Sequence, residues 1–405
     1  MKILLLCNKS PYPALEGGPM AMNSIVNGLL EAGHQVKILA VNSKKYNVKP
    51  EDIPDDYKAK TGIELIDVDL RVRPLKAFKN LFSKKSYHVE RFISKNFTNR
   101  LIEVLKKDNY DVVQLETLYM TPYVETIRNH SKALIVLRAH NVEHLIWERI
   151  AKGTRFFVKR LYINHLTKTL RNYELSAISQ VDGIAAITRK DAALFRKYCA
   201  TTTIDIPYGV DLEAFHPNYA VEAKPKFYHI GSMNWIPNEE GIRWFIDHCL
   251  DAVVAKVPDF VFHLAGRNMP EWLKNNKNPH LDVVGEVTDA KEFVANHNVA
   301  IVPLLSGSGI RIKIIESMAL GKTVITTLVG AEGILYNEDV NLIIAENKAK
   351  MAEAIRRIDQ HPEVAMEIGK AARKLVEEVY DNRKIIARLL MFYDQIKTSS
   401  KITFV

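Results

Sequence analysis

The stretch VAIVPLLSGSGIRIKIIESMALGKTVITTLVGAEG, residues 299–333, decides the fold of this chain. Val299 to Leu305 is a short and almost wholly apolar run, typical of a strand buried on both faces, and small residues follow it. From Ile310 the apolar residues recur near helical spacing until Gly321, and Lys322 to Thr327 has the pattern of another strand. The stretch therefore predicts a strand, a glycine loop, a helix and a second strand.

The glycine loop and the start of its helix have the residues of an anion site. The first N–H groups of such a helix point toward the carboxyl end of the sheet, where anions bind in open α/β folds. Gly307 and Gly309 allow the backbone to approach a ligand closely. Arg311 and Lys313 add two cations at a helix end that already favours anions, and Glu316 can accept hydrogen bonds from sugar hydroxyls. These residues predict a site for a diphosphate attached to a polyol.

Two simpler interpretations fit the same segment. Lys313 and Glu316 are spaced as an ordinary exposed ion pair on one helix face, and Ser308 is a residue type that caps helix N-termini. Two common nucleotide motifs do not fit. The GxxxxGK[ST] spacing of a P-loop is absent here, and GSGIRI lacks the third glycine of a dinucleotide fingerprint.

GSGIRIKIIESMALG resembles the donor-binding region of the retaining glycosyltransferases of family 4 (glycosyl transferases group 1), which have the two-domain GT-B fold. That family usually has two glutamates separated by seven residues, and the second falls on Glu316, for which the resemblance implies a catalytic and donor-binding role. Ser308 stands in place of the first glutamate, so a carboxylate contact to the transferred sugar is missing. Ser308, Gly309, Arg311 and Lys313 are the other donor-binding residues that we expect here.

Composition excludes several classes of protein. A chain of 405 residues exceeds the size at which single cores stop growing, so two domains are expected. The three cysteines are widely spaced and form no CxxC pair, which suggests neither a disulfide framework nor a zinc site and fits a reducing cytoplasm. The N-terminal apolar run is too short for a signal peptide, and no apolar stretch approaches the roughly 20 residues of a membrane span. We expect a cytoplasmic protein.

Strand patterns alternate with stretches long enough for helices in the first half, which predicts a doubly wound sheet. They cover Lys2 to Cys7, Gln35 to Val41, Ile63 to Asp69, Asp111 to Glu116, Ala133 to Ala139 and Gly183 to Ile187. Gly17 and Gly18 lie just before the first helix, as in a loop that meets an anion or a sugar, although a plain turn has the same pattern. In the resembled family this loop lies near the donor phosphates or the acceptor, so we expect Gly18 on the donor side and Gly17 on the acceptor side.

His140 follows the strand pattern ALIVLRA. A histidine at a strand end is more often structural than catalytic, yet ligand groups gather at the carboxyl ends of strands in such a sheet. The resembled family commonly has a histidine here that contacts the transferred sugar, which implies a catalytic role for His140 and a sugar-side role for Asn141. Glu143 and His144 are alternatives. In Asp67-Val68-Asp69 the two acidic residues alternate with an apolar one, as on the solvent-exposed face of a strand. We therefore predict no metal site there.

Ile206 to Pro217 resembles the segment that closes the first domain in this family. We therefore expect a Rossmann-like acceptor-side domain over 1–207, a linker over 208–225, a Rossmann-like donor-side domain over 226–380, and a crossing helix with a tail over 381–405. The second domain's strand patterns, beyond those in the opening stretch, cover Lys226 to Ser232, Asp259 to Ala265, Leu281 to Val284 and Asn341 to Ala345.

Two further glycines of the second domain are donor-binding candidates. Family members often have Gly-Arg after the first strand and a lysine at the next helix, both on the donor diphosphate. Here Gly231 is followed by serine and the helix has Glu240, so we infer that Arg311 and Lys313 replace those cations. Gly285 resembles the position at which the family reads the nucleotide base through its backbone.

The resemblance implies transfer of a sugar, with retention, from a UDP- or GDP-linked donor to an acceptor hydroxyl in the cleft between the domains. We expect no cofactor and no metal, because the cations and the helix N-terminus can stabilise the departing diphosphate. One alternative is a nucleotide-sugar epimerase or phosphorylase of the same fold, and another is a non-catalytic peripheral membrane protein. No nucleic acid is expected, because no platform of interleaved aromatic and basic residues is evident.

Basic charge is concentrated in the first half. Residues 1–207 hold 33 Lys and Arg against 21 Asp and Glu, whereas the remainder holds 23 against 26. Apolar residues lie among the cations of 71–107 and 152–171, a combination that predicts docking on anionic lipid; a solvated basic face is the alternative. Many members of the family act on lipid-linked acceptors at the inner face of the bacterial membrane, so a lipid-linked or oligosaccharide acceptor is expected. The candidate docking cations are Lys79, Lys84, Lys85, Lys159 and Arg160, with Phe78, Leu81, Phe82, Phe156, Phe157 and Tyr162 among them.

Overall fold

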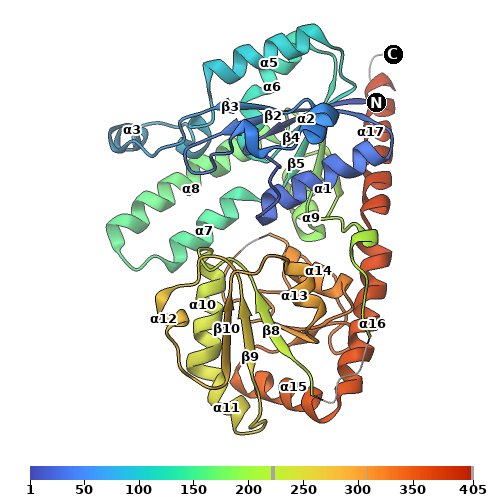
Figure 1. Cartoon of the computed structure of the whole chain (residues 1–405). Helices are drawn as coiled ribbons and strands as arrows, with labels where there is room; N and C mark the ends of the chain where they lie inside the picture. The colour runs from blue at the N-terminus through green and yellow to red at the C-terminus, as the bar shows by residue number, and fades with distance from the viewer. Residues whose placement is uncertain (220–223, 308, 403–405) are drawn as a thin grey trace. The chain divides into compact units, whose positions relative to one another are not determined.

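The computed structural model describes residues 1–219, 224–307 and 309–402. The chain divides into two compact units (Figure 1). Unit 1 comprises Met1–Gly209 together with Arg383–Val405, and unit 2 comprises Val210–Asn382. The end of the chain thus belongs to the unit in which the chain began.

Unit 1 is built on a seven-stranded parallel sheet in the order β3-β2-β1-β4-β5-β6-β7. The order reverses between β1 and β4, which makes the carboxyl ends of these strands a topological switch point. The strands are β1 (Lys2–Cys7), β2 (Gln35–Asn42), β3 (Glu64–Asp67), β4 (Val112–Glu116), β5 (Leu134–Ala139), β6 (Gly183–Ala186) and β7 (Thr202–Asp205).

Strand β1 shows why this sheet is covered on both faces. Ile3, Leu5 and Cys7 pack into one cluster with α1 and the terminal helix α17, whereas Leu4 and Leu6 pack into another with α5 and α9. Alternate residues of a strand point to opposite faces, so an apolar run such as KILLLC requires helices on both. The helices and helical turns are α1 (Gly17–Glu31), η1 (Pro50–Asp52), α2 (Asp55–Thr61), α3 (Pro74–Asn80), α4 (Tyr87–Glu90), α5 (Lys95–Lys107), η2 (Leu118–Tyr123), α6 (Val124–His130), α7 (Glu143–Gly153), α8 (Phe157–Ala177), α9 (Arg189–Tyr198) and α17 (Asn382–Ile402).

The sequence prediction missed one strand of this sheet, β7. Its four residues are exposed or only half-buried, and their polar sequence TTID has no apolar run. An edge strand is paired on one side only, so its sequence need not be apolar on both faces. The remaining six strands lie where the sequence predicted them, with ends that differ by at most two residues.

Unit 2 has a six-stranded parallel sheet in the order β10-β9-β8-β11-β12-β13, with its switch point between β8 and β11. Its strands are β8 (Phe227–Ile230), β9 (Phe262–Ala265), β10 (Leu281–Gly285), β11 (Val299–Val302), β12 (Thr323–Thr326) and β13 (Ile343–Ile344). Its helices and helical turns are η3 (Leu212–Ala214), α10 (Ile236–Trp244), the π-helical turn η4 (Phe245–Cys249), α11 (Leu250–Val254), α12 (Glu271–Lys274), α13 (Ala290–Ala295), α14 (Ile312–Ala319), α15 (Lys348–Gln360) and α16 (Pro362–Val379).

The strand–loop–helix–strand unit predicted over residues 299–333 is present, with a longer loop than expected. Strand β11 ends at Val302 rather than Leu305, because Pro303 has no N–H to donate to a neighbouring strand. Helix α14 begins at Ile312 rather than Ile310, which leaves Arg311 as its N-cap residue. The loop between them therefore has nine residues, 303–311.

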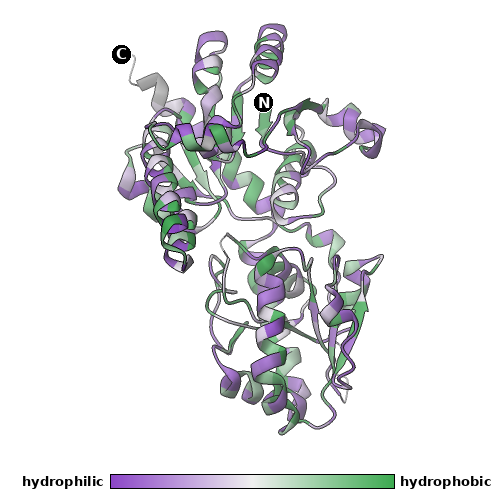
Figure 2. Ribbon diagram, turned by 90° about the vertical axis from the view of Figure 1, so that its left-hand side faces the viewer, coloured by the Kyte–Doolittle hydropathy of each residue, from purple (hydrophilic) through white to green (hydrophobic). Residues whose placement is uncertain are grey.

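The terminal helix α17 packs on the first sheet, as the predicted crossing helix should. Ile385, Leu389 and Phe392 are buried in the cluster that also contains Ile3 and Leu5 of β1. The helix continues to Ile402 and so includes residues that the sequence predicted as a tail. Many helices are green along one face and purple along the other in Figure 2, as expected for helices that bury one face. Among the described residues, no helix is long and apolar enough to cross a membrane.

Candidate functional site

Lys313 of α14 reaches the carboxyl end of β8, at the switch point of unit 2. Its Nζ lies 2.6 Å from Asn238 Oδ1 and 3.3 Å from His229 Nε2. The His229 Nδ1–H donates to the Ile301 carbonyl at 2.8 Å, so Nε2 has the lone pair that accepts from Lys313. The lysine is therefore held by groups from α10 and β8, the elements on either side of the β8–α10 loop.

Gly231 follows β8 and makes room for this lysine. A Cβ atom at this position would lie 2.7 Å from Lys313 Nζ and 2.7 Å from Asn238 Nδ2. Any side chain would displace one of the two, so the predicted donor-binding glycine packs directly on the predicted donor-binding cation. The two candidates, more than eighty residues apart in sequence, belong to one site.

The environment of Lys313 lowers its pKa from 10.5 to about 7, chiefly because burial penalises the charged form and secondarily because Arg311 repels it. Burial likewise lowers the pKa of His229 well below its ordinary value, and the nearby lysine adds to the shift. The hydrogen-bond contacts of Lys313 with His229 and Asn238 thus include no negatively charged group. A bound anion would stabilise the protonated lysine and raise its pKa again.

Arg311 supports the loop rather than lying open at the helix start. Its side chain is buried, and the guanidinium donates to the carbonyls of Gly309 and Val329, the latter at 3.3 Å. It also lies 5.7 Å from the centre of the Trp235 ring. Gly309 has a φ of 77°, a conformation that favours glycine. The sequence did not predict this burial, which arises because α14 begins one residue after Arg311.

The three other predicted donor-binding residues of this region are Glu316, Gly285 and Ser308. Glu316 is partly buried on α14, one turn beyond Lys313. Lys313 does not form the exposed ion pair with Glu316 that the sequence also allowed, because its ammonium group donates to Asn238 instead. Gly285 ends β10 with no atom within 4 Å of a Cβ added there, so its backbone is open. Ser308 lies outside the described residues.

His140, the predicted catalytic residue of unit 1, lies at the carboxyl end of β5 beside a buried carboxylate. Its Nε2 is 2.7 Å from Glu116 Oε2, while Arg138 Nη1 lies 3.4 Å from the same oxygen. Glu116 and Arg138 are fully buried, and the His140 side chain is 11% exposed. Burial would raise the pKa of Glu116, but Arg138 and His140 together hold it below its ordinary value. The carboxylate therefore stays ionised and accepts from His140 Nε2–H, so the neutral ring has its lone pair on Nδ1.

A polar chain connects this histidine to the terminal helix. Gln114 Nε2 donates to Glu116 Oε1 at 2.6 Å, and the Tyr393 hydroxyl of α17 donates to Gln114 Oε1. Burial lowers the pKa of His140, and the hydrogen bond to Glu116 opposes that shift. His140 is thus a mostly neutral ring held in one orientation by the chain Tyr393, Gln114, Glu116.

The two alternatives to His140, Glu143 and His144, are buried at the start of α7. His144 is 1% exposed, with Nδ1 2.6 Å from Glu174 Oε2. Glu174 also accepts from the main-chain N–H groups of Glu143 and His144, at 2.9 and 3.0 Å, and so caps the start of α7. Burial and the neighbouring Glu174 raise the pKa of Glu143 to about 7. Asn141 hydrogen-bonds to the Glu143 carboxyl group from the turn before α7.

Gly17 and Gly18 are the first residues of α1, at the carboxyl end of β1. A Cβ atom on Gly18 would lie 3.1 Å from Lys9 Cε, so the glycine packs against that side chain. The Lys9 ammonium group pairs with Glu16 at 3.0 Å. The two glycines thus lie at the edge of the first sheet that also holds His140, because all strands of this sheet are parallel.

The docking candidates are exposed. Lys79 is on α3, Lys84 and Lys85 follow it, and Lys159 and Arg160 are in the first turn of α8. Of the six apolar residues predicted among them, four are more than half exposed, and Leu81 and Tyr162 are half-buried. The exposed four are Phe78 (62%), Phe82 (83%), Phe156 (68%) and Phe157 (60%). In the described part of the chain, no group of three or more His, Cys, Asp or Glu side chains could hold a metal ion.

Sequence reasoning missed the partners of both candidate residues. They are His229 and Asn238 around Lys313, and Gln114, Glu116 and Arg138 around His140. Four of these five lie within strands or loops that are otherwise apolar, as in VVQLE and LIVLRA. A buried polar residue in such a strand needs a hydrogen-bond partner, and that requirement was the available signal.

Residues 224–361 match the family model described as "Glycosyl transferases group 1". A Klebsiella pneumoniae protein named "Uncharacterized 44.6 kDa protein in cps region" is 20% identical over 402 residues, which cover 96% of this chain and 98% of that protein. The match to the family model lies within unit 2, around the site at Lys313.

Solved structures extend the likeness to the whole chain. The sucrose-phosphate synthase of Thermosynechococcus elongatus has a TM-score of 0.71 at 17% identity, covering 98% of this chain and 100% of that one. Anabaena HepE in complex with UDP has a TM-score of 0.67 at 12% identity, with the same coverage. A Staphylococcus aureus TarM variant solved with fondaparinux, α-GlcNAc-glycerol and UDP has a TM-score of 0.68 at 13% identity, covering 97% and 100%. The chain has the GT-B fold, and its second unit contains a domain that matches the glycosyl transferases group 1 model.

Proposed function

We propose that this protein is a retaining glycosyltransferase that moves a sugar from a nucleoside diphosphate sugar to an acceptor hydroxyl. The observation that carries this proposal is Lys313, a half-buried lysine held at the switch point of the domain that matches the group 1 model. An ammonium group with a depressed pKa and no carboxylate among its described contacts suits a ligand that brings negative charge. HepE has been solved with UDP and with UDP-glucose, which supports a nucleotide ligand for this domain.

The departing diphosphate is the group that needs stabilisation. Negative charge builds on it as the sugar leaves, and a preorganised cation in a site with little water is an effective stabiliser. Lys313 and the first N–H groups of α14 supply that charge in our proposal, with Arg311 fixing the loop between them. Glu316 would hold the nucleotide ribose. UDP or GDP is the expected nucleotide.

His140 is proposed to orient the transferred sugar. It is held by Glu116, and the neutral ring keeps a lone pair on Nδ1 that can accept from a sugar hydroxyl. We assign no carboxylate among the described residues as a nucleophile for a covalent sugar intermediate, so we propose same-face attack by the acceptor, which retains the anomeric configuration.

The acceptor is proposed to be lipid-linked, in the assembly of a cell-surface glycan at the inner face of a membrane. The support is the pairing of exposed phenylalanines with exposed cations on α3 and at the start of α8. A cytoplasmic, peripheral location follows from such an acceptor. The Klebsiella relative is named as a protein of a cps region.

A thermal-shift comparison of UDP, GDP, ADP and CMP tests the donor proposal. A ligand at about 100 times its dissociation constant stabilises the folded protein by roughly 3 kcal/mol, so the correct nucleoside diphosphate should raise the unfolding midpoint. A response to none of the four would contradict the proposal. Incubation with the donor sugar alone separates the alternatives, because an epimerase changes the sugar without an acceptor and a transferase does not.

Activity should survive EDTA if Lys313 and the helix N-terminus stabilise the leaving group. The measurement is product formation before and after chelation, with added magnesium or manganese as the complementary arm. Loss of activity on chelation with rescue by either ion would contradict this part of the proposal.

A further inference from the structure

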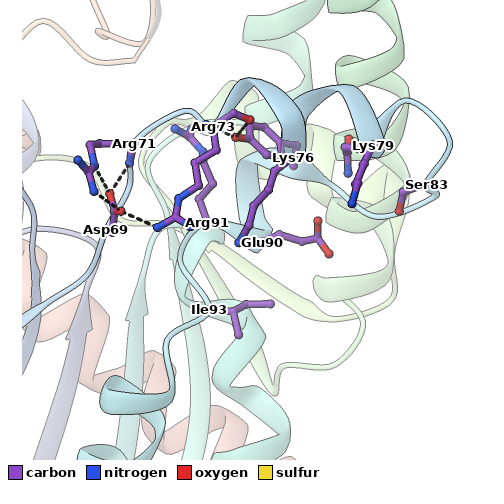
Figure 3. A pocket seen from close by; sticks show the side chains of 11 residues that line it. Asp69, Arg71, Arg73, Lys76, Lys79, Ser83, Glu90, Arg91 and Ile93 are labelled. Carbon is purple, nitrogen blue, oxygen red and sulfur yellow. Dashed lines mark hydrogen bonds and ion pairs between the residues drawn. The ribbon is translucent and has the colours of Figure 1, made fainter.

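A pocket of about 500 Å³ lies in unit 1, next to α3, and is strongly basic. The segment after β3, α3 and α4 supply its walls, and Figure 3 shows several cationic side chains around it. Two of the lining residues are acidic, Asp69 and Glu90, against five that are basic. The basic residues are Arg71, Arg73, Lys76, Lys79 and Arg91.

The acidic residues do not neutralise this pocket. Asp69 is shared by two guanidinium groups, with Arg71 Nε at 2.8 Å and Arg73 Nη2 at 2.9 Å. Hydrogen bonds from Arg71 and then Arg73 hold the pKa of Asp69 far below its ordinary value. Within the described residues, the ammonium groups of Lys76 and Lys79 make neither a hydrogen bond nor an ion pair. One carboxylate thus fixes two arginines, and two lysines still lack a counter-charge.

The side chains at the base of the pocket are fixed by hydrogen bonds and a cation–π contact within the protein. Tyr87 is buried, and its hydroxyl accepts from the Arg73 N–H at 2.9 Å. Arg91 donates to the Leu70 carbonyl at 2.9 Å, and its guanidinium lies 5.6 Å from the centre of the Tyr87 ring. Arg91 Nε is a buried donor with no acceptor among the described residues. The arginines are therefore held in place before any ligand arrives, which lowers the entropy cost of binding.

Exposed apolar side chains border the same pocket. Leu75 is 79% exposed, Phe78 62% and Phe82 83%, and the rings of Phe78 and Phe82 pack edge to face at 5.8 Å. Lys76 and Lys79 line the pocket, whereas these three residues do not. The segment α3 and its following turn thus present cations inward and hydrocarbon outward. An exposed apolar cluster of this kind marks a binding surface.

We propose that this pocket binds the phosphate or diphosphate group of an amphiphile, with its hydrocarbon chain on Leu75, Phe78 and Phe82. Guanidinium groups bind phosphate oxygens in pairs of parallel hydrogen bonds, and ammonium groups add point charge. A site for a free inorganic anion would not need the apolar border, and a purely apolar site would not need the cations. The amphiphile's role as acceptor rests on the proposed function, but its binding here does not.

Calorimetric titration of the full chain with geranyl diphosphate tests the proposal. We expect saturable binding, at least about tenfold tighter than that of inorganic diphosphate or of geraniol, because each of these probes lacks one half of the ligand. Lys76→Ala with Lys79→Ala should weaken binding at least about tenfold, as expected for lost charge-assisted hydrogen bonds. Lys95→Ala with Lys106→Ala is the matched control, because both lysines are exposed on α5 of the same unit and neither lines the pocket.

A second variant separates the two halves of the ligand. Phe78→Ser with Phe82→Ser should weaken geranyl diphosphate binding several-fold and leave inorganic diphosphate binding unchanged. Both phenylalanines are exposed, so this variant should fold, which circular dichroism checks. Equal weakening in the pocket and control lysine variants would overturn the proposal in favour of diffuse charge, and equally tight binding of inorganic diphosphate would assign the pocket to a free anion.

Two controls identify the source of the ligand. Geranyl diphosphate binding that is lost in Lys313→Met would place the probe in unit 2 and overturn the proposal. Displacement of bound geranyl diphosphate by phosphatidylglycerol vesicles would identify the amphiphile as a membrane phospholipid, and retention of geranyl diphosphate would identify it as a diphosphate with a single hydrocarbon chain. Binding of UDP and GDP is measured separately. If neither nucleotide binds, the proposed function is contradicted but the pocket proposal is not. If geranyl diphosphate does not bind, the pocket proposal is contradicted but the proposed function is not.

Discussion

At the scale of single residues, Lys313 couples ligand binding to a proton. Its pKa of about 7 means that a substantial fraction is neutral at pH 8, and a bound diphosphate would raise that pKa. We predict that binding of the nucleoside diphosphate at pH 8 takes up nearly one proton, and that its affinity falls as pH rises above 7. Calorimetry in buffers of different ionisation enthalpy measures the proton count.

Lys313→Met should abolish that uptake and weaken diphosphate binding by about 1.5 to 3 kcal/mol. Lys277→Met, an exposed lysine of the same unit, is the control and should change neither quantity. Proton uptake that persists in Lys313→Met would show that another group is responsible.

Glu116 is a positioning residue at the same scale, because it acts through His140. Glu116→Gln removes the charge that opposes the lowered pKa of His140 and leaves Arg138 without its carboxylate, so the histidine pKa should fall further. If activity needs the neutral ring, the acidic limb of the turnover profile should move to lower pH. Turnover itself should fall about 10- to 100-fold with nucleotide affinity unchanged. An unmoved acidic limb would argue against the pairing.

At the scale of elements, α17 stabilises the first unit by covering one face of its sheet. Phe392 is 2% exposed, and its ring would collide with any side chain at Gly183 of β6. Phe392→Ala should cost about 3 to 5 kcal/mol of unfolding free energy, measured by guanidinium titration followed by circular dichroism. Met391→Ala, next to it but 71% exposed, should stay within about 0.5 kcal/mol of the parent protein. Similar losses in both variants would contradict this packing.

The elements also show what the sequence could predict. Buried parallel strands such as β1 and β4 have largely apolar sequences, so every strand of both sheets except the edge strand β7 could be predicted from the residue pattern. Lys313 was found because its signal, a cation at a helix start, is local. Asn238 and His229 lie 75 and 84 residues from Lys313, and only the fold brings them to it. The burial of Arg311 likewise depended on where α14 begins, a boundary that residue pattern fixes only to within a few positions.

At the scale of the whole molecule, the charge divides between the two parts of the chain. The basic excess of residues 1–207 and the acidic remainder predict that anionic vesicles bind through unit 1. Lys79, Lys84 and Lys85 changed together to Glu should weaken cosedimentation with anionic vesicles, and added salt should weaken it in the parent protein. The same change at Lys277, Lys348 and Lys350 of unit 2 is the control for net charge. Equal cosedimentation with neutral vesicles at low salt would reject membrane docking.

The position of Tyr393 determines when the first unit is complete during synthesis. The ribosome makes residues 1–209 before unit 2, but the tyrosine that hydrogen-bonds to Gln114, and the helix that covers Ile3 and Leu5, are made only after unit 2. While unit 2 is being translated, one face of the sheet of unit 1 therefore lacks the cover that α17 provides. A chain that stops after unit 2 would lack both the cover of that sheet and the anchor of the His140 network, so His140 becomes fully supported only once α17 has been made.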